Sequence, residues 1–214
     1  MLTEPTLKCA AKLARANFAH IDMVELRVDF LQQEELSHLW RFPQMVDKPA
    51  ILTIRRVAEG GKFRGTESER RPLLDALSSG YRYVDLESDV DRSFDERVPA
   101  DVRVIRSMHD TIGMPDQLAR LVRNLPRSSA EIAKVAVTPR SGREMVDLIE
   151  IAQSFGMPGL TAPAERIVLG MGRFGIPTRI LAAHLGNFLT FCSLKQRSAA
   201  PGHLEPSAIP DLYR

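Results

Sequence analysis

Residues 132–137 read Ile-Ala-Lys-Val-Ala-Val, and Thr138-Pro139 closes the run. A short apolar run with β-branched residues that ends at a proline is typical of a buried strand. Lysine is among the residues least often buried, and burial disfavours the ammonium form of the side chain. A neutral amine attacks a carbonyl carbon and forms a Schiff base. By itself, Lys134 fits a structural pairing with a carboxylate better than catalysis, because buried ion pairs often serve structure alone.

Seven further apolar runs alternate with amphipathic stretches along the chain. This alternation predicts parallel βαβ units, and eight units predict a (β/α)₈ barrel, a fold of about 250 residues. We find no linker or repeat, so residues 1–214 are predicted to form a single TIM-barrel domain of the α/β class. The predicted strands are Met1–Thr3, Met23–Val28, Ala50–Arg55, Arg82–Glu87, Val102–His109, Ile132–Thr138, Arg166–Met171 and Phe188–Cys192. The predicted helices are Thr6–Ala19, Gln33–Trp40, Glu67–Ser79, Pro115–Leu125, Gly142–Phe155 and Pro177–His184, with a polar crossover at Asp91–Val98 and a turn near Ile209–Tyr213.

The composition excludes several classes of function. The 29 basic and 27 acidic side chains leave a net charge of +2, which gives no electrostatic case for binding nucleic acid. No apolar stretch approaches the roughly 18 residues that suggest a membrane span, and the N-terminus lacks a signal pattern. Cys9 and Cys192 have neither metal nor redox spacing, so we expect reduced thiols in a cytoplasmic protein. The sequence also lacks a zinc motif, a P-loop and a complete dinucleotide fingerprint.

Alternation along the predicted strands gathers charged side chains on one face. One face of each strand meets the helices and needs apolar residues, so the other set is predicted to point into the barrel. Buried charges are costly without partners, and a lysine surrounded by paired charges indicates a site rather than a core. Agreement among five strands, rather than any single residue, makes catalysis the favoured interpretation. The inward set is Glu25, Arg27, Arg55, Asp85, Glu87, His109 and Lys134.

Eight segments, spread over nearly the whole chain, form an ordered set of motifs. They are Val24-Glu25-Leu26-Arg27-Val28-Asp29, Thr53-Ile54-Arg55-Arg56-Val57-Ala58-Glu59-Gly60-Gly61, Tyr83-Val84-Asp85-Leu86-Glu87, Ser107-Met108-His109-Asp110, Lys134-Val135-Ala136-Val137, Met171-Gly172-Arg173-Phe174-Gly175 with Arg179, Gly186-Asn187-Phe188-Leu189-Thr190-Phe191, and Ala200-Pro201-Gly202. Any one of these motifs is weak, but all eight in the correct order are specific. Together they resemble the type I 3-dehydroquinate dehydratase family, the Schiff-base barrel enzymes of the shikimate pathway.

The resemblance implies a role for each matching residue. Lys134 is expected to condense with the C3 ketone of 3-dehydroquinate, and His109 to act as general acid and base, accompanied by the carboxylate of Glu59. The family reaction needs neither cofactor nor metal, and the family implies a homodimer. Substrate-binding positions of the family match Glu25, Arg27, Arg55 and Arg179, with Arg179 on the substrate carboxylate, while Met171 and Phe191 match the apolar pocket wall and Thr3 a serine near the substrate.

These roles fit elementary chemistry. A protonated imine at C3 is an electron sink, so it acidifies the neighbouring C–H and lets the β-hydroxyl leave. Histidine has the unperturbed pKa nearest neutrality, which suits a group that moves protons in both directions. An arginine fork matches a planar carboxylate better than lysine does.

The segment predicted to close over the substrate departs from the family pattern Ser-Ala-Pro-Gly-Gln. Residues 198–203 read Ser-Ala-Ala-Pro-Gly-His, so Ser198 takes the serine position with a one-residue insertion and Ala199 takes it without. His203 stands where the family has glutamine. We expect Ser198 and His203 to contact substrate, and the catalytic positions are intact.

Two other functions remain open at this point. A class I aldolase acting on a sugar phosphate shares the lysine but needs a phosphate cradle near strands seven and eight. Gly170-Met171-Gly172 resembles one, whereas Arg179 and the Pro201-Gly202 segment suit a carboxylate better. A catalytically inactive barrel that binds a metabolite is supported only by the altered segment at Ser198–His203.

Overall fold

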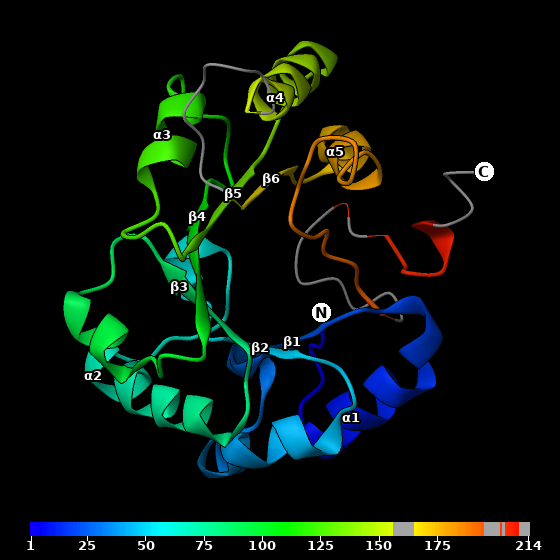
Figure 1. The fold of residues 1–214 in the computed structure, drawn as a ribbon. Helices are drawn as coiled ribbons and strands as arrows, with labels where there is room; N and C mark the ends of the chain where they lie inside the picture. Colours follow the sequence, from blue (N-terminus) through cyan, green and yellow to red (C-terminus); the bar gives the residue numbers. More distant parts are fainter. Residues whose placement is uncertain (156–164, 195–201, 203, 210–214) are drawn as a thin grey trace. The chain divides into compact units, whose positions relative to one another are not determined.

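A computed structural model of the chain describes residues 1–155, 165–194, 202 and 204–209. These residues divide into two compact units, Met1–Val104 and Ile105–Arg214, and Figure 1 follows the chain through both. No helix in the described part of the chain is long and apolar enough to cross a bilayer. The prediction of one domain over residues 1–214 stays a prediction.

The first unit is a parallel sheet of three strands, β1 (Val24–Arg27), β2 (Ala50–Thr53) and β3 (Tyr83–Glu87). Helical segments precede, separate and follow these strands, as alternating βαβ units require. They are α1 (Leu7–Ala16), η1 (Phe18–His20), η2 (Val28–Phe30), η3 (Gln33–Met45), η4 (Val57–Glu59), α2 (Glu67–Arg70), η5 (Arg71–Ser79) and η6 (Arg92–Arg97), where η marks a 3₁₀ helix.

The second unit repeats the pattern with β4 (Arg103–His109, its first two residues in the first unit), β5 (Ile132–Val137) and β6 (Arg166–Gly170), paired in parallel in that order. Their connections are α3 (Leu118–Asn124) and α4 (Gly142–Ser154), while η7 (Arg173–Gly175) and α5 (Ile176–Ile180) follow β6. The parallel α/β class is therefore as predicted.

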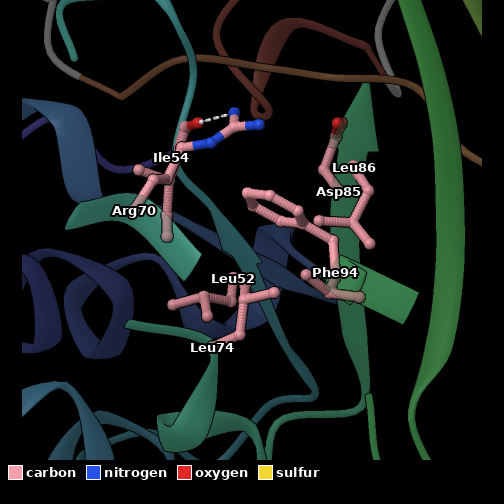
Figure 2. Close-up of a pocket in the computed structure, with 8 residues that line it drawn as sticks. Leu52, Ile54, Arg70, Leu74, Asp85, Leu86 and Phe94 are labelled. Carbon is pink, nitrogen blue, oxygen red and sulfur yellow. Dashed lines mark hydrogen bonds between the residues drawn. The ribbon is translucent and has the colours of Figure 1, made fainter. Parts of the chain in front are cut away.

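The strands bury one face against the helices. In the second unit Ala133, Val135 and Val137 of β5 share a core cluster with Leu148 of α4 and Val122 of α3. In the first unit Figure 2 shows Leu52, Leu86, Leu74 and Phe94 around a packing gap too narrow for water. Because side chains alternate along a strand, the intervening residues face the opposite side of each sheet.

The two outermost predicted strands were wrong in extent. Leu2 makes only a single parallel bridge to Leu26, with its N–H donating to the Glu25 carbonyl (2.8 Å) and its carbonyl accepting from the Arg27 N–H (3.1 Å). The predicted strand Phe188–Cys192 does not form a strand. The Asn187 side chain explains the loss, because its amide donates to the Val168 carbonyl (3.0 Å) and accepts from the Val168 N–H (2.9 Å). It occupies the positions on β6 that another strand needs.

The predicted helix Glu67–Ser79 is also divided. Thr66 starts α2 with a capping box, in which its hydroxyl accepts from the Glu69 N–H and the Glu69 carboxylate accepts from the Thr66 N–H. Pro72 has no N–H to continue the α-helical ladder, and the chain proceeds from Arg71 as a 3₁₀ helix. The predicted turn near Ile209 is described only as far as Ile209.

A close approach of two glycines sets α5 against β6. A Cβ atom on Gly175 would lie 2.2 Å from the Gly170 carbonyl carbon. Thr178 of α5 reinforces the contact, because its hydroxyl accepts from the Gly170 N–H (2.8 Å) and donates to the Gly175 carbonyl (2.7 Å). Any side chain at Gly175 must therefore push α5 away from the strand.

Gly175→Ala should lower the free energy of unfolding by about 1–3 kcal/mol, because backbone atoms on both elements have to move. Gly142→Ala is the control, since nothing lies within 4 Å of the Cβ position at this first residue of α4; its expected change is within about 0.5 kcal/mol. Urea unfolding of the two variants measures the difference. Equal stabilities would contradict the close contact.

Candidate active site

The predicted site residues fall into two groups, one in each unit. Thr3, Glu25, Arg27, Arg55 and Glu59 lie in the first unit, and the second unit holds His109, Lys134, Met171, Arg179 and Phe191. Ser198 and His203 lie outside the described residues. Each group is described within its own unit.

Lys134 is a buried residue on the face of β5 that points away from α3 and α4. Its neighbours in register are Ser107 of β4 and Ile167 of β6. Only 5 % of Lys134 is exposed, and its Nζ lies 4.1 Å from the centroid of the Phe191 ring. An ammonium over an aromatic face is attracted to it, and the ring also excludes water. The Phe191 ring thus lies directly beside the amine.

His109 is the last residue of β4 and is half-buried. It pairs in register with Ala136, two residues beyond Lys134, so the histidine and the lysine share one face of the sheet. The next residue anchors this strand end. The Asp110 carboxylate accepts from the N–H groups of Ile112 (2.9 Å) and Gly113 (2.8 Å), and its carbonyl accepts from the Thr138 hydroxyl (2.9 Å). The turn after His109 is therefore tied to the end of β5.

Arg179 of α5 is a buried cation in the same unit. Only 2 % of the residue is exposed, Nη1 donates to the Phe191 carbonyl (3.2 Å), and the buried Nε has no hydrogen-bond partner among the described residues. Burial lowers the pKa of Arg179 to about 10, and the charge of Cys192 opposes this shift. No acidic side chain pairs with Arg179 in the part of the chain that the structure describes. A carboxylate ligand fits such a guanidinium.

Met171 directly follows β6 and is buried. Its N–H donates to the Val137 carbonyl (2.7 Å), which extends the pairing of β6 with β5 by one residue. By alternation from Ile167 and Leu169, Met171 falls on the Lys134 face. Gly202, from the segment predicted to close over substrate, packs against the backbone of Gly172 beside it.

Glu25 and Arg27 lie on the corresponding face of β1. The Glu25 carboxylate accepts from the Thr53 hydroxyl (2.9 Å), while its Oε2 is buried with no hydrogen-bond partner among the described residues. Arg27 makes a bidentate pair with Asp29 (2.8 and 2.7 Å). Asp29 also accepts from the Lys62 N–H (2.9 Å), so it links Arg27 to the loop after Glu59. Thr3 is buried beside the Leu2 bridge.

Arg55 follows β2 and carries the densest charge network of the first unit. Its guanidinium contacts Asp85 (2.5 Å), Glu87 (3.0 Å) and Glu59 (3.5 Å). Burial alone lowers the pKa of Arg55, but the three carboxylates outweigh burial and raise it above its ordinary value. The guanidinium therefore stays charged although only 3 % of the residue is exposed.

Glu59 ends η4 in a tight loop that returns to Arg55. The loop is closed by hydrogen bonds from Phe63 N–H to the Arg55 carbonyl (3.1 Å) and from Gly61 N–H to the Arg56 carbonyl (2.9 Å). Burial raises the pKa of Glu59 to about 7; Arg55 opposes this rise, while Glu87 and Asp85 add to it. A carboxyl group with a pKa near 7 can give and accept protons at neutral pH.

Several residues that support the site were not among the predicted site residues. Ser107 pairs in register with Lys134, and Asp29, Asp85, Glu87 and Arg70 hold the charged side chains of the first unit. Alternation already put Asp85 and Glu87 on the correct face. Arg70 left no such signal, because an arginine in a helix normally points to solvent.

A groove with space for a ligand in the first unit lies away from the candidate residues. This groove of about 690 Å³ runs between η3 and the loop after Glu59, with Asp29, Leu31, Lys62 and Phe63 in its lining and none of the candidate residues. Among the described residues, no cluster of three His, Cys, Asp or Glu side chains is arranged to hold a metal ion.

The chain has parallel strands joined by helices, and buried charged residues lie on the face of the strands turned away from those helices. This arrangement places the chain among the parallel α/β enzymes. Residues 1–214 match the profile of the type I 3-dehydroquinase family. The 3-dehydroquinate dehydratase of Methanocaldococcus jannaschii is 28% identical over 100% of this chain and 96% of the relative, and that of Methanothermobacter thermautotrophicus is 34% identical over 89% and 83%. The crystal structure of 3-dehydroquinate dehydratase from Geobacillus kaustophilus HTA426 is 26% identical, with a TM-score of 0.82 over 99% of this chain and 87% of that one. The chain belongs to the type I 3-dehydroquinase family, which confirms the resemblance seen in the motifs.

The raised pKa of Glu59 predicts a specific dependence of stability on pH. The folded chain keeps this proton up to about pH 7, whereas the unfolded chain releases it near 4.5. The contribution of Glu59 to stability therefore falls as pH rises through that window. Glutamine has no proton to lose, so the stability of Glu59→Gln relative to the parent should be greater at about pH 8 than at about pH 5. Urea unfolding at the two pH values measures this difference.

The exposed Glu150 of α4 provides the control, and Glu150→Gln should differ from the parent by the same amount at both pH values. A Glu59→Gln difference that does not change with pH would show that Glu59 ionises at its ordinary pKa.

Proposed function

We propose that the chain carries out its family's reaction, the conversion of 3-dehydroquinate to 3-dehydroshikimate and water, with Lys134 holding the substrate as an imine. The observation that carries this proposal is the pair of buried basic side chains in the second unit. Lys134 is buried with its Nζ against the Phe191 ring, and Arg179 has no acidic partner among the described residues. The substrate brings a ketone for the amine and a carboxylate for the guanidinium.

The steps balance without an added reagent. His109 takes a proton from the Lys134 ammonium, and the free amine attacks the C3 carbonyl. His109 then returns the proton to the carbinolamine hydroxyl, which leaves as water and gives a protonated imine. His109 removes a proton from C2, and the electron pair moves toward the imine as an enamine. His109 then protonates the C1 hydroxyl, which leaves as water while the C1–C2 double bond forms. Hydrolysis of the imine releases 3-dehydroshikimate and restores the lysine.

The remaining site residues bind and orient the substrate in this proposal. Glu59 serves as the carboxylate that accompanies His109, and Arg179 grips the substrate carboxylate. A pKa of about 7 suits Glu59 to this work. Contacts with the substrate are further assigned to Thr3, Glu25, Arg27, Arg55, Met171, Phe191, Ser198 and His203.

The wider organisation belongs to the same proposal. A single (β/α)₈ catalytic domain over residues 1–214 is supported by the solved relative that matches almost the whole chain. Homodimerisation rests on the family alone, and a cytoplasmic location on the two cysteines without disulfide or metal spacing.

Sodium borohydride added with 3-dehydroquinate should fix the substrate to Lys134, because it reduces the imine to a stable amine. Peptide mapping by mass spectrometry locates the adduct.

Lys134→Ala should give no adduct and no turnover, measured by the ultraviolet absorbance of the enone product. His109→Ala should still bind substrate but slow both imine hydrolysis and proton transfer. Lys8→Ala, on the exposed side of α1, is the control with parental activity. Near-parental turnover in Lys134→Ala would rule out the imine mechanism.

Arg179→Met should raise KM by about 10- to 100-fold, the usual loss for a hydrogen bond to a charged group. Arg179→Lys keeps the charge but loses the planar fork, so its KM should lie between those of Met and the parent. Steady-state kinetics measures both. An unchanged KM in Arg179→Met would remove Arg179 from the substrate-binding site.

A further inference from the structure

Glu87, the last residue of β3, is surrounded by three arginines. It is 1 % exposed, and its Oε1 lies 3.0 Å from Nη1 of Arg55 and 3.6 Å from Nε of Arg56, whose backbone N–H also donates to it (3.4 Å). Its Oε2 accepts from Nη1 of Arg70 (2.6 Å). One buried carboxylate thus joins the Arg55 network to a residue of α2.

Arg70 is itself held firmly on the helix-covered side of the sheet. It donates to the Ile54 carbonyl (3.1 Å) and to Glu67 (2.9 Å), and its guanidinium carbon lies 5.0 Å from the centroid of the Phe94 ring. Figure 2 shows Arg70 and its bond to Ile54 among the apolar residues of that layer. The proposed reaction does not use Arg70 or Glu87.

The position of Arg55 depends on its carboxylate partners. Glu59 belongs to a loop, and Asp85 and Glu87 belong to β3. The second oxygen of Glu87 accepts a hydrogen bond from the guanidinium of Arg70, which ties Glu87 to α2. A shift of Glu87 therefore moves Arg55, and with it the Glu59 carboxylate that contacts Arg55.

We propose that Glu87, anchored by Arg70, is a positioning residue that holds Arg55 and Glu59 in their working geometry without touching the substrate. This inference rests on the proposed roles of Arg55 and Glu59. Electrostatics supports it, because the charge of Glu87 adds to the effect of burial in raising the pKa of Glu59.

Two substitutions separate the charge of Glu87 from its reach. Glu87→Gln keeps the length of the side chain but removes the charge, so the pKa of Glu59 should fall clearly below about 7. Glu87→Asp keeps the charge but is one methylene too short to hold Arg55 and Arg70 together. In Glu87→Asp the pKa of Glu59 should fall less, while kcat/KM drops about 100-fold because Arg55 is misplaced. Carboxyl-detected NMR of ¹³C-labelled Glu measures the pKa of Glu59 without substrate.

The matched control is the buried pair of Arg106 and Glu131 in the second unit, with Nη2 and Oε1 2.6 Å apart. Glu131→Gln disturbs a buried ion pair of the same kind, but should leave the pKa of Glu59 and kcat/KM at parental values. If it changed both quantities as Glu87→Gln does, the effect would be general loosening, and the proposal would fall.

A folded Glu87→Gln with an unchanged pKa of Glu59 would also overturn the proposal, as would a Glu87→Asp enzyme with parental kcat/KM. If Glu87→Gln does not fold, the kinetics of Glu87→Asp against Glu131→Gln decides. The NMR titration needs no turnover, so its failure is distinct from a failure of the proposed function, which the borohydride adduct on Lys134 tests.

Discussion

The ion pair between Arg55 and the carboxylates around it is the interaction on which the site in the first unit depends. Removing a guanidinium and a carboxylate from water costs several kcal/mol for each group, and only close pairing with further hydrogen bonds offsets that cost. Arg55, Asp85 and Glu87 meet this condition because β2 and β3 run parallel and in register, so that residues two apart reach one face. Glu59 is added from a loop that closes on the Arg55 backbone. Its proximity to two buried carboxylates helps to keep a proton on it near neutral pH.

In the second unit, apolar packing on one face of the sheet places the candidate residues on the other face. The opposite face of β5 is packed against α3 and α4, which leaves Lys134 on the face shared with Ser107, His109 and the ring of Phe191. The contact between Gly170 and Gly175 brings α5 onto the end of β6 and sets the place of Arg179. Backbone geometry thus sets the places of Lys134 and Arg179, and the proposed substrate supplies a ketone for the first and a carboxylate for the second.

The prediction from sequence was most successful where a single strand carried the pattern. Period-two alternation placed Glu25, Arg27 and Lys134 on the faces where the structure has them, because the geometry of one strand needs no distant contact. It was less successful at both ends of the predicted barrel. The first strand shrank to a bridge at Leu2, and Asn187 took the hydrogen bonds on β6 that the eighth strand needed. Whether a side chain takes the hydrogen bonds of a neighbouring strand depends on which residue folding brings to the edge of the sheet. The local sequence pattern does not contain that information.

The sequence by itself determined the parallel α/β class, the lysine in a buried strand, and the ordered motifs that identify the family. Each of these depends on local periodicity or on residue identity. Only the tertiary structure decided which partners the charged side chains have. Asp29, which pairs with Arg27, also binds the backbone of Lys62, 33 residues after Asp29. Arg70 of α2 binds Glu87 at the end of β3, and Arg179 is buried beside the Phe191 carbonyl. The physical reason is that a charge becomes buried, paired or shifted in pKa through atoms brought close by folding, and these atoms are far apart along the chain.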